Sequence, residues 1–284
     1  MKNPVLIECP RDAMQGMKKW IPTKKKIGYI QSLLEVGFDV LDVGSFVSPK
    51  TIPQMRDTSE VLQNIDLSQS KSDLLVIVAN LRGCKEAVLH KNITYIGFPF
   101  SVSENFQMRN THKTQTESLL LLNQLIELCE IHGKKLVVYL SMGFGNPYGD
   151  PWSVSIVMNW FNLLISKGVK FISLSDTVGK AKVEDISSLF KASIAQYPEI
   201  EIGAHFHTQP QNSLIKIKAA YDSGCYRFDG VIKGFGGCPM AADDLTGNLP
   251  TEKLISFFNQ QKISIQLDPI KFEYAYNQSL TVFI

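Results

Sequence analysis

The sequence alternates eight times between a short apolar run and a longer amphipathic stretch. The short runs are rich in β-branched and aromatic residues, which is typical of buried parallel strands. They cover residues 5–8, 40–43, 74–79, 93–98, 136–140, 171–174, 200–206 and 227–232. The longer stretches carry apolar residues at helical spacing, and they cover residues 24–36, 59–65, 81–89, 115–131, 152–166, 182–197, 211–223 and 250–260. Eight strand–helix units predict an α/β protein that folds as a (β/α)8 TIM barrel, with an active site at the C-terminal face of the strands.

Glycine placement agrees with this pattern, because Gly37, Gly133, Gly168 and Gly224 each lie just past an amphipathic stretch. The residue just past a helix end often takes a left-handed conformation, which glycine adopts at least cost. The main alternative is a doubly wound open sheet, which usually carries a glycine-rich phosphate-binding turn after its first strand. Residues 9–15 read CPRDAMQ here and contain no such motif. The closed barrel is therefore the favoured fold.

The length of 284 residues fits one barrel domain, since such barrels commonly use about 250 residues. We expect a single domain over residues 1–284, with the barrel at about 4–262 and a short C-terminal extension at 263–284. The interval 101–114 is polar, and we expect a functional loop there.

Charge and hydropathy narrow the choice of partners and compartment. The net charge is only +2 and the mean hydropathy is close to zero, which argues against a nucleic-acid partner. No uncharged apolar run approaches the roughly 18 residues that span a bilayer, so we expect no membrane partner. The five cysteines are widely spaced without a CxxC pair, which favours a reducing cytoplasm over a disulfide framework.

Polar residues stand at the ends of several predicted strands, next to apolar runs. Because a closed parallel sheet brings the carboxyl ends of its strands to one rim, these side chains are expected to meet there and to form the active site of an enzyme. They are Arg11 and Asp12, Asp42, Asp176 and Thr177, His205 and His207, and Cys238 followed by Asn248.

His205 and His207 are separated by one residue, so on a strand both side chains point to the same side and Phe206 to the other. This geometry suits two ligands of one metal ion. Asp12 and Asn248 add hard oxygen ligands, and such a mixed set leaves positions open for substrate oxygens. The sequence therefore predicts a divalent ion, Mg²⁺ or Mn²⁺, in preference to a closed structural zinc site.

Arg11 is adjacent to Asp12, and on a strand end the two side chains would point in different directions, one to a substrate oxygen and one to the metal. A fixed guanidinium suits an enolate or a carboxylate. Cys238 lies in the glycine-rich loop GFGGCP at 234–239, where a thiol can deliver or remove a proton. The other four cysteines are interpreted as small apolar fillers.

Together these motifs resemble those of the hydroxymethylglutaryl-CoA lyases, a family within the DRE-type metallolyase group of (β/α)8 barrels. The resemblance runs from about Ile7 to Leu254. It is carried by ECPRDAMQ at 8–15, SFVSPK at 45–50 with PQM at 53–55, SLSDTVG at 173–179, HFH at 205–207, and GFGGCP at 234–239 with GNL at 247–249.

The resemblance implies cleavage of 3-hydroxy-3-methylglutaryl-CoA to acetyl-CoA and acetoacetate, as in leucine degradation and ketone-body formation, by a homodimer that takes an acyl-CoA substrate. It implies that Asp12, His205, His207 and Asn248 hold the metal. It also implies catalytic roles: Arg11 stabilises the enolate, Cys238 protonates it, and Asp42 and Asp176 assist proton movement and orient Arg11. Pocket positions that it implies are Gln15, Ser45, Tyr139, Ser173 and Thr177, and candidates for the coenzyme A phosphates are Lys18, Lys19, Lys50 and Arg109.

The chain departs from the family pattern at three places. Asp42 stands where better-known members have glutamate, Thr208 replaces the aspartate after the HxH pair, and residues 141–147 lack a cysteine. Two alternatives stay open from the sequence. One is another metallolyase, such as a 4-hydroxy-2-oxoacid aldolase or an isopropylmalate or homocitrate synthase; the other is a catalytically inactive barrel that serves as a binding protein.

Overall fold

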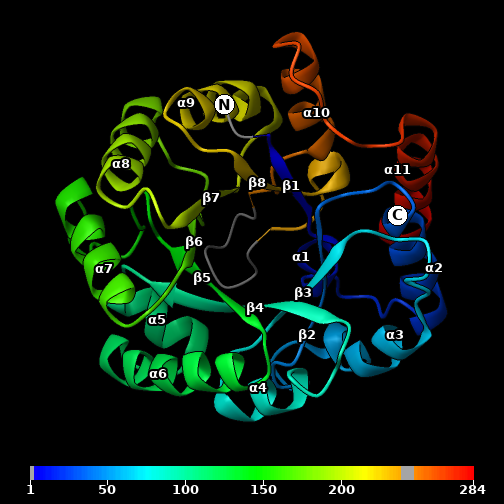
Figure 1. The fold of residues 1–284 in the computed structure, drawn as a ribbon, viewed down its shortest axis with the longest axis horizontal. Coiled ribbons are helices and arrows are strands. Elements are labelled where there is room, and N and C mark those ends of the chain that lie inside the picture. Colours follow the sequence, from blue (N-terminus) through cyan, green and yellow to red (C-terminus); the bar gives the residue numbers. More distant parts are fainter. Residues whose placement is uncertain (1–2, 238–245) are drawn as a thin grey trace.

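The computed structural model describes residues 3–237 and 246–284, and its centre is a closed barrel of eight parallel strands (Figure 1). Neighbours in the barrel are consecutive in sequence, and β1 pairs with β8 to close it, with Val5 opposite Arg227. The strands are β1 (Val5–Glu8), β2 (Val40–Ser45), β3 (Asp73–Ile77), β4 (Ile93–Ser101), β5 (Lys135–Ser141), β6 (Phe171–Asp176), β7 (Glu201–Phe206) and β8 (Arg227–Gly230). The predicted TIM barrel and all eight predicted strands are confirmed.

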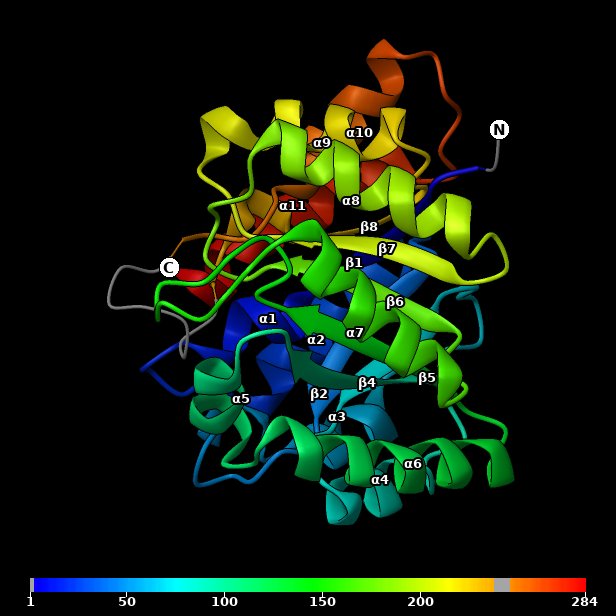
Figure 2. The ribbon, with the colours of Figure 1, turned by 90° about the vertical axis from the view of Figure 1, so that its left-hand side faces the viewer.

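The eight predicted helices are confirmed with small shifts of their bounds, and they surround the barrel (Figure 2). They are α2 (Thr23–Leu34), α3 (Thr58–Asn64), α4 (Leu81–Ala87), α6 (Gln115–Ile131), α7 (Val154–Ser166), α8 (Val183–Gln196), α9 (Ser213–Asp222) and α10 (Thr251–Gln260). Short 3₁₀ turns lie at Pro53–Met55 (η1), Pro210–Asn212 (η2) and Ile232–Gly234 (η3). The four glycines predicted at helix ends all have positive φ, between 63° and 100°.

Three further helices were not predicted from the sequence: α1 (Pro10–Gln15), α5 (Glu104–Thr111) and α11 (Pro269–Phe283). The expectation that 101–114 forms a loop is therefore wrong, because most of it is α5. Ser103 caps α5, since its hydroxyl accepts a hydrogen bond from the Phe106 N–H at 3.0 Å. Figure 2 shows α1 and α5 at the end of the barrel opposite the N-terminus.

Helix α11 lies beside α2 on the outside of the barrel (Figure 1). Edge-to-face ring contacts hold it there: Phe283 packs on Tyr29 at 5.6 Å between ring centroids, and Phe272 packs on Phe38 at 6.5 Å. Such aromatic pairs add to the burial of apolar area. Among the described helices, none combines the length and the apolar character that crossing a membrane requires.

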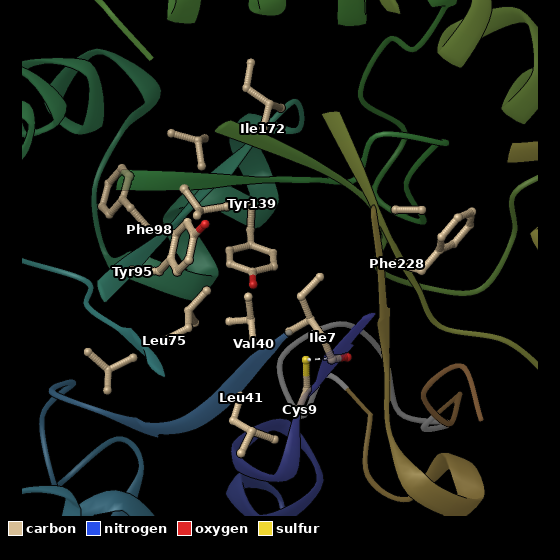
Figure 3. Close-up of a cluster of buried hydrophobic side chains, with 14 of the residues drawn as sticks. Ile7, Cys9, Val40, Leu41, Leu75, Tyr95, Phe98, Tyr139, Ile172 and Phe228 are labelled. Atoms are coloured by element: carbon tan, nitrogen blue, oxygen red, sulfur yellow. Dashed lines mark hydrogen bonds between the residues drawn. The ribbon is translucent and has the colours of Figure 1, made fainter. Parts of the chain in front are cut away.

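The interior of the barrel is filled mainly by apolar and aromatic side chains, as Figure 3 shows for Ile7, Val40, Leu75 and Tyr139. A glycine makes room for them: a Cβ at Gly97 would lie 2.5 Å from Ile77 Cδ1 and 2.9 Å from a ring carbon of Tyr139. The packed interior closes the barrel below its C-terminal rim, so the polar side chains at the rim are supported by a close-packed core.

Candidate active site

Helix α1 carries Arg11 and Asp12, and both side chains are buried. The expectation that the two stand on a strand end is wrong, because both lie in the first turn of α1. Their side chains are in contact, since Arg11 Nη1 donates to Asp12 Oδ1 at 2.9 Å. The same nitrogen donates to Gln15 Oε1 at 2.9 Å. Arg11 also donates twice to Asp42 Oδ2 on β2, from Nε at 3.0 Å and from Nη2 at 2.5 Å. The guanidinium is thus fixed from two elements.

Asp42 reaches Arg11 although its side chain is one methylene shorter than that of a glutamate. The carboxyl is fully buried, and this burial raises its pKa to about 6, although the charge and hydrogen bonds of Arg11 act in the opposite direction. For Arg11, burial alone would lower the pKa, but the charges of Asp42 and Asp12 outweigh it and raise the pKa. Asp42 therefore orients a guanidinium that stays charged.

His205 and His207 lie at the end of β7 with their ring centroids 5.3 Å apart, while Phe206 packs against Phe144 and Phe190 on the other side. The predicted alternation along the strand is confirmed. His205 Nδ1 lies 2.9 Å from Asp229 Oδ2 on β8, which leaves Nε2 facing Asp12 Oδ2 at 3.8 Å. A carboxylate behind a histidine fixes which ring nitrogen is free to bind a metal.

The surroundings shift the pKa values of the two histidines in opposite directions. Burial lowers the pKa of His207 to about 4, so the ring is neutral at neutral pH and able to act as a ligand. Burial also opposes the charged form of His205, but the hydrogen bond and charge of Asp229 outweigh it and raise its pKa. For Asp12, burial alone would raise the pKa, but Arg11 and the two histidines lower it. Asp12 is therefore an anion beside two imidazoles.

Three side chains of this cluster offer atoms that could bind a metal ion. Asp12, His205 and His207 offer ligand atoms that all lie within 4.8 Å of one another. Among the described residues, Asp12 Oδ2 and His207 Nδ1 are buried and have no hydrogen-bond partner. A buried polar atom without a partner is costly, and a divalent ion between them would satisfy both. The donor set of one carboxylate oxygen and two imidazole nitrogens therefore fits a divalent metal ion.

Asn248, the fourth predicted ligand, lies beside this cluster. Its backbone forms an antiparallel bridge with His207, and its side chain contributes to lowering the pKa of Asp12. Its Nδ2 donates to the Phe235 carbonyl at 2.8 Å, which leaves the side-chain carbonyl oxygen as the atom that could coordinate a metal.

A pocket opens at the C-terminal rim directly over this cluster. Arg11, Asp12, His205 and His207 are among the residues that line it. Four of the five predicted pocket positions line it too, namely Gln15, Ser45, Tyr139 and Thr177. Ser173 is the exception: it lies on β6 in register with Tyr139 of β5 and Gly203 of β7, and it is not among the described residues that line the pocket.

Most of the other lining residues are apolar, and the sequence did not single them out. They include Val47, Ile52, Ile77, Ala79, Pro99 and, from α5, Phe106, Asn110 and Thr111. A pocket that combines a guanidinium and polar groups with apolar side chains suits an organic anion with an aliphatic part.

A family model described as HMGL-like matches residues 7–277. The chain belongs to the HMGL-like family. Among its relatives, hydroxymethylglutaryl-CoA lyase YngG of Bacillus subtilis is 32% identical over 254 residues, which are 89% of this chain and 84% of that protein. A lyase of Pseudomonas aeruginosa, named for 3-hydroxy-3-isohexenylglutaryl-CoA and hydroxymethylglutaryl-CoA, is 30% identical over 262 residues, which are 91% of this chain and 85% of that protein.

Solved structures of HMG-CoA lyases share the fold throughout. One from Acinetobacter baumannii, in complex with coenzyme A and 3-methylmalate, has a TM-score of 0.91 and 27% identity and covers 99% of this chain and 91% of its own. The enzyme from Bacillus subtilis has a TM-score of 0.90 and 31% identity, with 98% and 92% covered.

In this HMGL-like chain, Asp176 has a partner that the sequence did not suggest. Lys216 of α9 is buried, and its Nζ lies 2.6 Å from Asp176 Oδ2. The same ammonium donates to the carbonyls of Gly179 at 3.0 Å and His207 at 3.3 Å. Burial raises the pKa of Asp176, and Lys216 opposes this. Asp42, and not Asp176, holds Arg11 in this structure, while Asp176 and Lys216 tie the ends of β6 and β7 together.

Cys238 lies outside the described residues, so its predicted place near the rim stays a prediction.

Asp229 is a residue that the sequence analysis missed. The only signal was its position inside the predicted strand 227–232, two residues after Arg227, and this did not mark it as part of the site.

Proposed function

We propose that the chain is a hydroxymethylglutaryl-CoA lyase that cleaves 3-hydroxy-3-methylglutaryl-CoA to acetyl-CoA and acetoacetate. One observation carries this proposal: the available ligand atoms of Asp12, His205 and His207 converge beside the fixed guanidinium of Arg11 in a single pocket. The names of the relatives support it, and so does the coenzyme A bound in the Acinetobacter enzyme.

The reaction needs no oxidant or reductant. The C3 hydroxyl gives up its proton and its oxygen forms the new ketone, while the C2–C3 bond breaks and its electron pair passes into the enolate of the acetyl thioester. C2 then takes up a proton, and acetyl-CoA leaves. The site must therefore acidify a hydroxyl, stabilise an enolate oxygen and supply a proton.

The proposed metal ligands are Asp12, His205, His207 and Asn248, and a bound Mg²⁺ or Mn²⁺ would act as a Lewis acid that lowers the pKa of the substrate hydroxyl. Arg11 would stabilise the enolate oxygen. A guanidinium has five N–H groups; four hydrogen bonds to Asp12, Gln15 and Asp42 use four of them. The remaining Nη2–H would donate to the enolate oxygen.

The remaining roles rest on the family resemblance. Cys238 would protonate C2, and Gln15, Ser45, Tyr139 and Thr177 would contact the acyl group. Lys18, Lys19, Lys50 and Arg109 are exposed and would meet the coenzyme A phosphates. We also propose a cytoplasmic homodimer that works in leucine degradation or ketone-body formation; light scattering on the purified protein tests the dimer.

The deciding experiment is a lyase assay with the purified protein, Mg²⁺ and 3-hydroxy-3-methylglutaryl-CoA. We expect acetoacetate and acetyl-CoA in equal amounts, and loss of turnover by orders of magnitude in Cys238→Ser with metal affinity unchanged. A protein that forms no acetoacetate but turns over in an aldolase or synthase assay would contradict the proposal. The aldolase alternative is less well supported, because the putative aldolase from Bacteroides vulgatus is only 16% identical to this chain and shares the fold alone.

A further inference from the structure

Glu8 is a fully buried carboxyl group that the proposed reaction does not use. It is the last residue of β1, next to Ile7, whose side chain lies in the barrel interior (Figure 3). Because side chains alternate along a strand, Glu8 points outward, toward the layer of helices and loops. It therefore stands behind the active site, four residues before Asp12.

The two oxygens of Glu8 bind both ends of one segment. The Ile232 N–H donates to Oε1 at 2.8 Å, and the Thr251 hydroxyl shares a hydrogen bond with Oε2 at 2.5 Å. These residues stand at the two ends of segment 232–251, which leaves the barrel after β8 and returns to begin α10. We call 231–234 and 248–251 the neck of this segment. Glu8 links both sides of the neck to the end of β1.

The neck is also paired within itself. The Val231 N–H donates to the Leu249 carbonyl at 2.9 Å, and the Thr251 N–H donates to the Val231 carbonyl at 3.1 Å. The Asn248 N–H donates to the Gly234 carbonyl at 3.1 Å. These backbone hydrogen bonds position Asn248 beside His207, and Glu8 binds the same two sides of the neck.

Glycines in and beside the neck allow close packing around it. A Cβ at Gly230 would lie 2.7 Å from the Thr251 hydroxyl oxygen, and one at Gly234 would lie 2.7 Å from the Asn248 carbonyl. A Cβ at Gly236 would lie 2.7 Å from Ala13 Cα on α1. The described part of the segment thus packs directly against the helix that carries Arg11 and Asp12.

We propose that Glu8 is a positioning residue for the proposed metal site, because it clamps both sides of the neck to β1 and so sets the place of Asn248 beside Asp12 and His207. The role in metal binding rests on the proposed function, whereas the contacts of Glu8 with the neck are independent of it. Burial raises the pKa of Glu8 to about 8, so the carboxyl keeps its proton at neutral pH. Because Oε1 accepts from the Ile232 N–H, that proton lies on Oε2, in the hydrogen bond with the Thr251 hydroxyl. Glu252 and Tyr29 are the other titratable groups that face it.

The test compares two variants of Glu8. Glu8→Leu keeps the approximate size but removes both acceptors, whereas Glu8→Gln keeps an acceptor for the Ile232 N–H and offers an amide to the Thr251 hydroxyl. We expect Glu8→Leu to weaken Mn²⁺ binding, measured by electron paramagnetic resonance, by about 10-fold or more, as is usual for groups that orient ligands. Amide exchange in 231–237 and 246–251 should accelerate to a similar extent. Glu8→Gln should stay within about threefold of the wild type in both measurements.

The matched control is Asp39→Leu, at the opposite rim of the barrel, where the Asp39 carboxylate accepts a hydrogen bond from the Leu6 N–H of β1 at 2.7 Å. It should lower the melting temperature without changing Mn²⁺ affinity or exchange in the neck. Thr251→Val removes one of the two contacts and serves if Glu8→Leu does not fold.

Mn²⁺ affinity and neck exchange in Glu8→Leu within twofold of the wild type would overturn the inference. Loss of Mn²⁺ affinity in Asp39→Leu as well would also overturn it, because the effect would then be one of general stability. If the wild type itself showed neither lyase activity nor metal binding, the proposed function would fail, and neck exchange alone would still decide whether Glu8 is the clamp.

Discussion

At the scale of single residues, the proposed metal site depends on Asp229 as much as on its ligands. Asp229 Oδ2 lies 2.9 Å from His205 Nδ1, so that Nε2 is the nitrogen left for coordination. Asp229→Asn can present its amide to Nδ1 and favour the other tautomer, with the proton on Nε2. We expect Mn²⁺ affinity to fall by about 10- to 100-fold, measured by isothermal calorimetry. Asp222→Asn, in an exposed pair with Lys218, should change it by less than twofold; equal loss in both would contradict this role for Asp229.

Asp42 allows a prediction that separates metal binding from catalysis. Its carboxylate receives two hydrogen bonds from Arg11 and is not among the residues whose ligand atoms cluster for a metal. Asp42→Asn would place an amide against a guanidinium that needs an acceptor and would let it turn. We expect kcat to fall by about 100-fold or more, with Mn²⁺ affinity within about threefold of the wild type. A steady-state assay beside a metal titration checks this, and a parallel loss of both would make Asp42 part of the metal site.

At the scale of elements, α5 brings Phe106, Asn110 and Thr111 to the pocket. Ser103 caps the N-terminus of this helix. Its hydroxyl accepts a hydrogen bond from the Phe106 N–H and donates one to the Asp150 carboxylate. Ser103→Ala should cost about 1 kcal/mol of stability, as lost caps do, and should raise KM several-fold while leaving kcat nearly unchanged.

Ser153 offers the matched control for this prediction. It caps α7 in the same way, by accepting from the Ile156 N–H at 3.2 Å, but no described residue of α7 lines the pocket. Ser153→Ala should therefore cost similar stability without a change in KM. Thermal melts and steady-state kinetics of both variants decide the point, and an equal rise in KM would mean that α5 does not shape the acyl-CoA site.

At the scale of the whole molecule, the sequence predicted the barrel because its signal is repeated eight times and each strand is buried on both sides. It predicted His205 and His207 on one side because alternation along a strand is a geometric certainty. It did not predict α1, since a six-residue helix after Cys9 and Pro10 has no periodicity to show. Nor could it show that Asp229 and Lys216 stand behind the site, because both contacts join residues far apart in sequence, 24 and 40 positions respectively.

The response of the whole fold to pH offers a last prediction. The pKa of Glu8 is about 8 in the folded chain against 4.5 for an exposed glutamate, because burial disfavours the anion. The stability that this proton contributes is fully present below pH 4.5 and is lost as the pH rises through 8. Glu8→Gln cannot ionise, and Asp42, whose pKa is also raised, is common to both proteins. Urea unfolding between pH 5 and pH 9 should therefore show wild-type stability falling relative to Glu8→Gln, by up to about 1.4 kcal/mol per pH unit. Parallel curves would mean that Glu8 does not keep its proton in the folded barrel.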